Sequence, residues 1–259
     1  LDTMEKCSED LRKLVDAIRP GIAVEAEVPV PFEHLGSHQM SWIEHWGEKL
    51  VTDPPGILRN KWVERRHMHH RVARFNRDHT AELHSAWMNG CGMLVWENVF
   101  GSEILWSPRD QSILRSMRPV QQRYGRMFCG ENWTPFVETA AQDIFASLWE
   151  ENGVRLWTVA NRADEARSGH ILSANTETGT RCFDLIRGVE ITPPETEGVS
   201  SMAGTIRPRG IGCFVVLPVS QVDDGFLRFV EGQKAIDSRA DWDSASPISP
   251  ERRKRPRPA

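Results

Sequence analysis

The sequence predicts an α/β region followed by an all-β region, and three observations support this. Strand-like and helical hydrophobic patterns alternate over residues 1–130. Over residues 131–236, short strand-like runs are separated by Gly, Pro, Asn and Thr, as in an antiparallel β-sandwich, and a helix closes the region. Residues 237–259 are polar, basic and proline-rich, which is typical of a disordered linker.

The N-terminal segment predicts a strand end, a helix and a strand. Residues 1–3 have the pattern of the last residues of a strand. Apolar residues then recur at helical spacing as far as Ile18, and Pro20-Gly21 ends the helix. Residues 22–28 alternate apolar and acidic side chains, and this period of two indicates a second strand.

The next elements are a short helix near 42–46, a strand over 56–63 and a helix over 81–88 that Asp78 caps. The apolar run 93–96 lies between glycines and predicts a strand buried on both faces. A longer helix follows, capped by Ser107 or Asp110, carrying apolar residues to Phe128 and kinked at Pro119. In the all-β region, Asn152-Gly153 predicts a hairpin, and further strands are expected at 169–174, 180–186, 199–206 and 210–219.

Composition excludes several classes of protein. The formal net charge of −4 argues against a general nucleic-acid binder. No apolar run approaches the roughly 20 residues that a membrane helix requires. The five cysteines are scattered without a C-x-x-C pair, which favours free thiols over a zinc site or a disulfide framework. We expect no cofactor, no nucleic-acid partner and no membrane association. The chain begins without an initiator Met, and we expect it to be cut from a longer protein.

Charged and polar residues gather at four predicted strand ends: Asp2, Glu25 with Glu27, the region 63–70, and Glu97. The carboxyl ends of parallel strands in a (β/α)8 barrel surround one catalytic mouth. We therefore expect residues 1–130 to form the C-terminal half of a TIM barrel, with its first three or four strands upstream of Leu1.

Two carboxylates that face each other across a mouth are what glycosidic bond cleavage requires. One protonates the leaving oxygen, and the other attacks the anomeric carbon or activates water. Asp2 and Glu97 are the predicted pair, with Glu27 in reserve. Asp2 could instead cap its helix, and Glu25 and Glu27 could pair with nearby arginines. The predicted substrate-binding residues are Glu25, Trp62, His67, His69, His70, Trp96 and Asn98.

The run His67-x-His69-His70, with His79 and His84 nearby, raises a metal-dependent hydrolase as an alternative. None of the recognised zinc spacings is matched, and His79 and His84 are five residues apart rather than four. We predict no metal, and either a sugar-hydroxyl-binding role or plain surface exposure for these histidines.

The runs 67–70, 78–90, 92–101 and 179–188 resemble a group of uncharacterised bacterial proteins. These proteins share a barrel-plus-sandwich plan with glycoside hydrolases of the α-galactosidase and α-fucosidase type. The resemblance implies a nucleophilic Asp at the end of the fourth barrel strand, which Asp2 matches by position. The acid/base of that type is commonly an Asp on a later strand, where this chain has Glu97. Longer members of the group carry a formylglycine-generating-enzyme domain downstream.

The leading interpretation is a glycoside hydrolase with a carbohydrate substrate. A non-catalytic carbohydrate-binding or scaffold module attached to a modifying enzyme is the alternative of a different class. The sequence leaves the sugar, the oligomeric state and the compartment open, and a secreted or periplasmic location is compatible with the resemblance.

Overall fold

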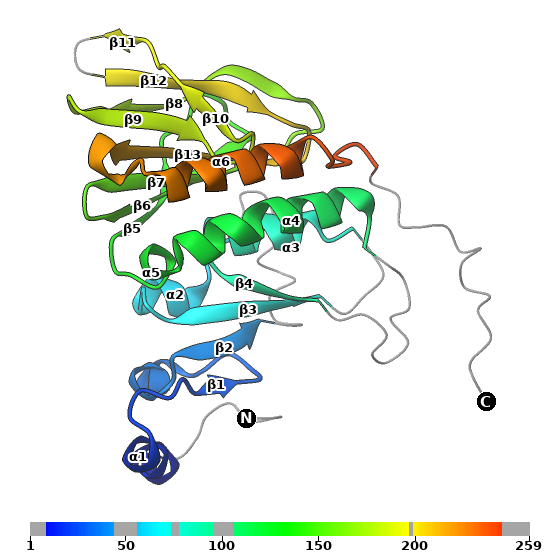
Figure 1. The fold of residues 1–259 in the computed structure, drawn as a ribbon. Coiled ribbons are helices and arrows are strands. Elements are labelled where there is room, and N and C mark those ends of the chain that lie inside the picture. Colours follow the sequence, from blue (N-terminus) through cyan, green and yellow to red (C-terminus); the bar gives the residue numbers. More distant parts are fainter. Residues whose placement is uncertain (1–8, 44–55, 74–77, 96–105, 197–198, 245–259) are drawn as a thin grey trace, which may run out of the picture.

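The computed structural model describes residues 9–43, 56–73, 78–95, 106–196 and 199–244. They form a four-stranded parallel sheet, a six-stranded antiparallel sheet and a three-stranded antiparallel sheet. Helices α3 and α4 lie between the parallel sheet and the six-stranded sheet, so the molecule is layered (Figure 1). None of the helices described has the length and apolar character needed to span a bilayer.

The parallel sheet has strand order β1-β2-β3-β4, which is also the order along the chain. Glu25 pairs with Met40 and His70 pairs with both Trp42 and Gly92, so the register is continuous across the sheet. Connections between neighbouring parallel strands contain the helices, as short βα units require. The elements of this region are α1 (Glu9–Ile18), β1 (Glu25–Ala26), η1 (Phe32–Ser37), β2 (Met40–Ile43), α2 (Arg59–Val63), β3 (Met68–Ala73), α3 (Thr80–Met88) and β4 (Gly92–Val95).

Two predicted elements of this region were wrong. Residues 40–43 form strand β2 instead of a short helix, and residues 59–63 form helix α2 instead of a strand. In β2, Ser41 and Ile43 are buried while Met40 and Trp42 are half-buried, which is the alternation of a strand. As a result, the histidine-rich run begins strand β3 and does not follow a strand end.

Of the helices between the sheets, α4 begins at a side-chain cap and α3 does not. The N-cap of α3 is His79, which makes no side-chain cap hydrogen bond, and the predicted cap residue Asp78 precedes it and accepts from the Thr80 backbone N–H at 2.8 Å. Ser107 Oγ accepts from the Asp110 N–H at 3.0 Å and caps α4 (Pro108–Arg123), which continues through Pro119. A short helix, α5 (Gly125–Phe128), follows.

The antiparallel sheets are built from β5 to β13. The β6–β7 hairpin turns at Asn152 and Gly153, whose φ angles of 50° and 78° fit the predicted two-residue turn. The six-stranded sheet has the order β10-β9-β13-β7-β6-β5 and the three-stranded sheet β11-β12-β8. The strands are β5 (Trp133–Val137), β6 (Ile144–Glu151), β7 (Val154–Asn161), β8 (Arg167–Asn175), β9 (Thr180–Asp184), β10 (Val189–Ile191), β11 (Glu195–Thr196), β12 (Val199–Ile206) and β13 (Ile211–Pro218).

Each face of the six-stranded sheet packs on a different hydrophobic core. One core lies against the three-stranded sheet and includes Trp157 and Phe214. The other includes Trp87 of α3 and Trp149 of β6, and it extends through α4 and α6 (Asp224–Asp237). Because this second core contains residues from both sides of residue 130, the predicted boundary there does not separate two cores.

Residues 238–244, which were predicted to belong to the disordered linker, are part of the folded chain. Trp242 is only 5% exposed and belongs to the core beneath α4. The Ser112 hydroxyl donates to the Asp241 carbonyl, and the Arg109 N–H donates to the Ser244 carbonyl. Residues 238–244 therefore pack with the folded chain. A short 3₁₀ helix, η3 (Val219–Gln221), precedes α6.

Candidate active site

Glu25 and His70 are hydrogen-bonded to each other on one face of the parallel sheet. His70 Nδ1 donates to Glu25 Oε1 at 2.5 Å, and the two side chains are 33% and 31% exposed respectively. Because the strand order is β1-β2-β3, this pair bridges across β2. Trp42 is paired with His70 in register and lies on the same face. We call this face, with Glu25, Trp42 and His70, the open face.

The position of the His70 ring depends on Gly92 of the neighbouring strand β4. A Cβ atom at residue 92 would lie 2.7 Å from His70 Cδ2 and 3.2 Å from Nε2. The glycine therefore leaves the room that the imidazole occupies. Since Glu25 binds Nδ1, Nε2 is the ring nitrogen that lies over β4, the strand after which Trp96 and Glu97 follow in sequence.

The opposite face of the sheet is buried and carries a chain of hydrogen bonds. We call this face, with Ser41, Ile43 and His69, the covered face. Ser41 Oγ lies 2.9 Å from His67 Nε2 and 3.1 Å from His69 Nδ1. The three side chains are at most 1% exposed. His67 and His69 were predicted to bind substrate together with His70, but the structure places them away from His70.

The tautomers of these histidines follow from their partners. His67 Nδ1 must donate to the His38 carbonyl, which lies at 3.1 Å, so Nε2 of the neutral ring accepts from the Ser41 hydroxyl. Ser41 Oγ in turn accepts from His69 Nδ1. Burial lowers the pKa of His67 to about 4 and holds the pKa of His69 well below its usual value. Both rings are therefore neutral at pH 7 and act as structural hydrogen-bonding groups.

Trp62 and Lys61 lie on helix α2, not on the strand predicted there. Trp62 is 60% exposed, whereas Lys61 is fully buried and donates to the carbonyls of Arg65 and Phe128 at 2.7 and 2.6 Å. Burial lowers the pKa of this lysine. Lys61 thus links α2 to α5, and Trp62 lies outside the group of residues that the open face brings together.

Glu27 follows the last residue of β1 and is half-buried, as expected for a residue at the carboxyl edge of the sheet. Asp2, Trp96, Glu97 and Asn98 lie outside the described residues. In sequence, Glu97 comes two residues after the last residue of β4. Of the predicted site residues that the structure describes, Glu25 and His70 are in contact and Glu27 follows at the end of β1, whereas Trp62, His67 and His69 lie elsewhere. Sequence reasoning missed Trp42 as a member of the open face, although its alternation with Ser41 and Ile43 is visible in the sequence.

The histidines do not converge as a metal site. Among the described residues, no three His, Cys, Asp or Glu side chains are placed to hold an ion. His70 lies on the open face, whereas His67 and His69 share Ser41 on the covered face. The alternative of a metal-dependent hydrolase required these imidazoles to meet at one point, and the structure places them on opposite faces of the sheet.

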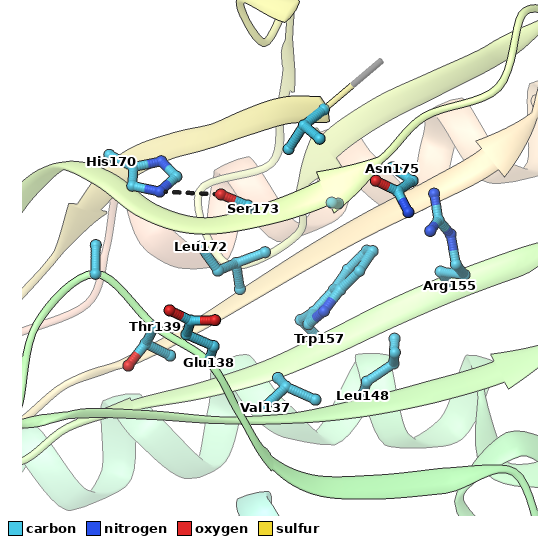
Figure 2. A pocket seen from close by; sticks show the side chains of 13 residues that line it. Val137, Glu138, Thr139, Leu148, Arg155, Trp157, His170, Leu172, Ser173 and Asn175 are labelled. Carbon is cyan, nitrogen blue, oxygen red and sulfur yellow. Dashed lines mark hydrogen bonds between the residues drawn. The ribbon is translucent and has the colours of Figure 1, made fainter. Parts of the chain in front are cut away.

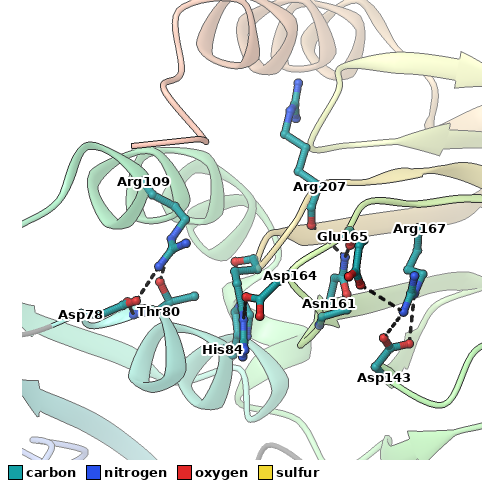
Figure 3. A network of polar contacts seen from close by, with 12 residues as sticks. Asp78, Thr80, His84, Arg109, Asp143, Asn161, Asp164, Glu165, Arg167 and Arg207 are labelled. Carbon is teal, nitrogen blue, oxygen red and sulfur yellow. Dashed lines mark hydrogen bonds and ion pairs between the residues drawn. The ribbon is translucent and has the colours of Figure 1, made fainter. Parts of the chain in front are cut away.

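A polar network anchors α3, which packs behind the parallel sheet (Figure 3). Arg109 donates to Asp78 Oδ2 at 2.5 Å. His84 Nε2 donates to the Arg209 carbonyl at 3.0 Å, and Arg209 Nε donates to Asp164 Oδ1 at 2.8 Å. Burial lowers the pKa of His84 to about 3, so the ring is neutral and structural, like His67. His79 and His84, which lie near the histidine run 67–70 in the sequence, are both in this buried part of the fold.

The sequence matches no protein-family model and no curated protein. Among solved structures, the chain is similar to an α-amylase from Anoxybacillus that is described with a new glycosyl hydrolase subclass, with a TM-score of 0.53 at 10% identity over 81% of this chain and 55% of that chain. An α-amylase from H. orenii matches with a TM-score of 0.52 at 12% identity, over 81% of this chain and 56% of that chain. An α-amylase from Geobacillus thermoleovorans, complexed with acarbose, matches with a TM-score of 0.53 at 9% identity, over 80% of this chain and 56% of that chain.

These similarities show that the chain has a glycoside-hydrolase-like, mixed α/β fold. The chain spans about 55% of the length of the enzymes it matches.

Proposed function

We propose that this chain is part of a glycoside hydrolase that acts on a carbohydrate. In this proposal the parallel sheet is the C-terminal half of a (β/α)8 barrel, the antiparallel sheets form a β-sandwich behind it, and the open face lines the catalytic mouth. The observation that carries the proposal is the Glu25–His70 pair, half-exposed on the open face with Trp42 beside it in register. The glycoside-hydrolase-like fold is consistent with this assignment.

Glycosidic bond cleavage requires one carboxylic acid that protonates the leaving oxygen and one carboxylate that attacks the anomeric carbon or activates water. We assign these roles to Glu97 and Asp2, with Glu27 as the reserve carboxylate at the end of β1. The proposal assigns these residues to the ends of different barrel strands, where barrel enzymes carry their catalytic groups.

His70 and Glu25 are assigned to substrate binding. The carboxylate of Glu25 fixes His70 as the Nδ1–H tautomer, so Nε2 is an acceptor for a sugar hydroxyl. Trp42 offers an aromatic face of the kind on which the C–H face of a pyranose stacks. Trp96 and Asn98 complete the proposed binding residues, while His67, His69 and Trp62 take no direct part.

The decisive experiment replaces Glu97 by Gln and measures hydrolysis of a panel of oligosaccharides, whose sugar leaving groups require protonation. Loss of the general acid is expected to lower kcat/KM by roughly 10²–10⁴-fold. A matched control is Glu33→Gln in η1, which makes the same chemical change away from the open face and should retain full activity. Turnover by Glu97→Gln equal to that of the wild type contradicts the assignment.

A second experiment separates binding from chemistry. Replacing His70 by Ala removes a substrate-binding group and leaves the carboxylates intact, so KM is expected to rise while kcat changes less. If kcat falls as steeply as in Glu97→Gln with KM unchanged, His70 acts in the chemical step, and its assignment to binding is wrong.

A further inference from the structure

A cleft opens between the two antiparallel sheets, on the side of the six-stranded sheet that faces away from α3 and α4. It has a volume of about 380 Å³ and is bounded by β6 and β7 on one side and β8 on the other (Figure 2). Small-molecule sites typically measure roughly 300–1,000 Å³. The cleft is therefore large enough for a small ligand, and the six-stranded sheet and the helices separate it from the open face.

The floor of the cleft is apolar and its rim is polar. Leu148, Trp157 and Leu172 form the floor, and Trp157 is only 3% exposed because it also belongs to the core between the two sheets. Glu138 and Thr139 lie on one side of the indole, and Arg155 and Asn175 on the other (Figure 2). This combination of an aromatic floor and convergent polar groups is the usual composition of a ligand site.

The arginine of the cleft differs from its neighbours. Arg155 has no carboxylate partner within the described part of the chain, and its guanidinium lies over the Trp157 ring, 5.5 Å from the centroid. Four other arginines of the antiparallel region are each paired with a carboxylate: Arg167–Asp143, Arg181–Glu190, Arg207–Asp237 and Arg209–Asp164. The donors of Arg155 are therefore available to a ligand.

Glu138 and Asn175 are available in the same way, whereas Thr139, His170 and Ser173 of the same lining are already hydrogen-bonded. In the portion of the chain that the structure describes, no side-chain hydrogen bond involves Glu138 or Asn175, and the indole N–H of Trp157 has no acceptor. One carboxylate, one guanidinium, one amide and one indole N–H thus border a single cleft. Glu138 and Arg155 carry opposite charges, so their contributions to the net charge of the cleft cancel.

We infer that this cleft binds a neutral sugar at a second, non-catalytic site. Sugar hydroxyls both donate and accept hydrogen bonds, and the rim supplies acceptors and donors together. The C–H face of a pyranose would lie against Val137 and Leu148, the partly exposed apolar residues of the lining, above the buried Trp157. Because the charges of Glu138 and Arg155 cancel, the cleft exerts little net electrostatic attraction on an acidic or a basic ligand, which favours a neutral one. The inference does not depend on the proposed hydrolysis, since it concerns different residues.

The test titrates the full chain with maltotriose and with cellotriose in a calorimeter. One of them is expected to bind, and Arg155→Ala and Asn175→Ala are each expected to weaken that binding about tenfold, since each removes hydrogen bonds to the ligand. Trp157→Phe keeps an aromatic floor and removes only the N–H donor, so it provides a second measurement if Arg155→Ala does not fold.

Two controls locate the effect. Arg181→Ala removes a guanidinium that lies over Phe183 at 5.2 Å on the same sheet but outside the cleft, and it should bind sugar as the wild type does. His70→Ala alters the open face and should also leave this affinity unchanged, so a failure of the proposed active site does not affect the result. The inference is overturned if neither sugar binds, if both cleft variants bind unchanged, or if a tetraglutamate peptide binds in the cleft instead.

Discussion

The parallel-sheet region and the antiparallel region are stabilised in different ways. Within the described residues, the two hydrophobic clusters confined to the parallel region have three members each, Ala26, Val30 and Leu35 in one and Ile43, Leu58 and Cys91 in the other. The same region buries a polar set that comprises His38, Ser41, Asn60, Lys61, His67 and His69. The antiparallel region instead buries large aromatic side chains such as Trp133, Trp149, Phe183 and Phe214.

This difference indicates that the two regions have different roles in the fold. Apolar burial contributes stability in proportion to area, whereas buried polar groups contribute little net stability but fix geometry. The antiparallel region therefore supplies stability, and the parallel region uses hydrogen bonds to hold the strands that carry the candidate site. Helix α3 connects the two, since Trp87 Nε1 donates to the Gly212 carbonyl and the Met88 carbonyl accepts from Ser147 Oγ.

The largest expected loss of stability comes from a substitution in the hydrophobic core that the two regions share. Trp87→Ala empties a fully buried site in the shared core and is expected to lower the free energy of unfolding by about 3–5 kcal/mol. Urea denaturation should show both regions unfolding together. Trp62→Ala is the matched control, because Trp62 is 60% exposed and its loss should cost little. Two separated transitions in the wild type would show that the regions are independent.

A buried residue in each region is expected to make stability depend on pH, but in opposite directions. In the parallel region this residue is His67. His67 has a pKa of about 4 in the folded chain, against 6.5 in the unfolded chain. The unfolded chain then binds more protons, so stability is complete above pH 6.5 and is lost as the pH falls toward 4. The loss from this residue is at most about 3–4 kcal/mol. In His67→Gln, the urea midpoint should depend less on pH over this range than in the wild type. Above pH 7, the difference in midpoint between the variant and the wild type should be constant.

Asp184 in the antiparallel region should show the opposite sign. Burial raises the pKa of its carboxyl from 3.8 to about 6 in the folded chain, so the folded state binds the proton more tightly. Its contribution is complete below pH 3.8 and is lost as the pH rises through 6, by up to about 3 kcal/mol. Asp184→Asn keeps an oxygen that can accept from the N–H groups of Ile186 and Arg187. This variant should gain stability relative to the wild type between pH 4 and 7, and a constant difference would refute the assignment.

The same comparison explains how much of the fold was predictable from sequence. In the antiparallel region, turn residues separate the strands, and the Asn152-Gly153 hairpin and the strand at 199–206 were confirmed. In the parallel region, a four-residue strand and a five-residue helix are too short to show a period, so 40–43 and 59–63 were exchanged. The site depends on strand register, because neighbouring residues such as His69 and His70 point to opposite faces. Once the strand was misplaced, the pairing of His70 with Glu25 could not be predicted.

The smallest expected change in stability comes from Gly92→Ala, which should alter the open face and leave the covered face unchanged. Gly92→Ala places a Cβ 2.7 Å from His70 Cδ2, so the ring must move and its bond to Glu25 is weakened. A cost of at most about 1 kcal/mol is expected, because the open face is half-exposed and can relax. Nitrogen NMR should show His70 losing its fixed Nδ1–H tautomer, while the signals of His67 and His69 on the covered face remain unchanged. Gly36→Ala is the control, since no heavy atom lies within 4 Å of a Cβ there. If Gly92→Ala leaves the His70 tautomer unchanged, Gly92 does not position the ring, and the open face does not depend on β4 for its geometry.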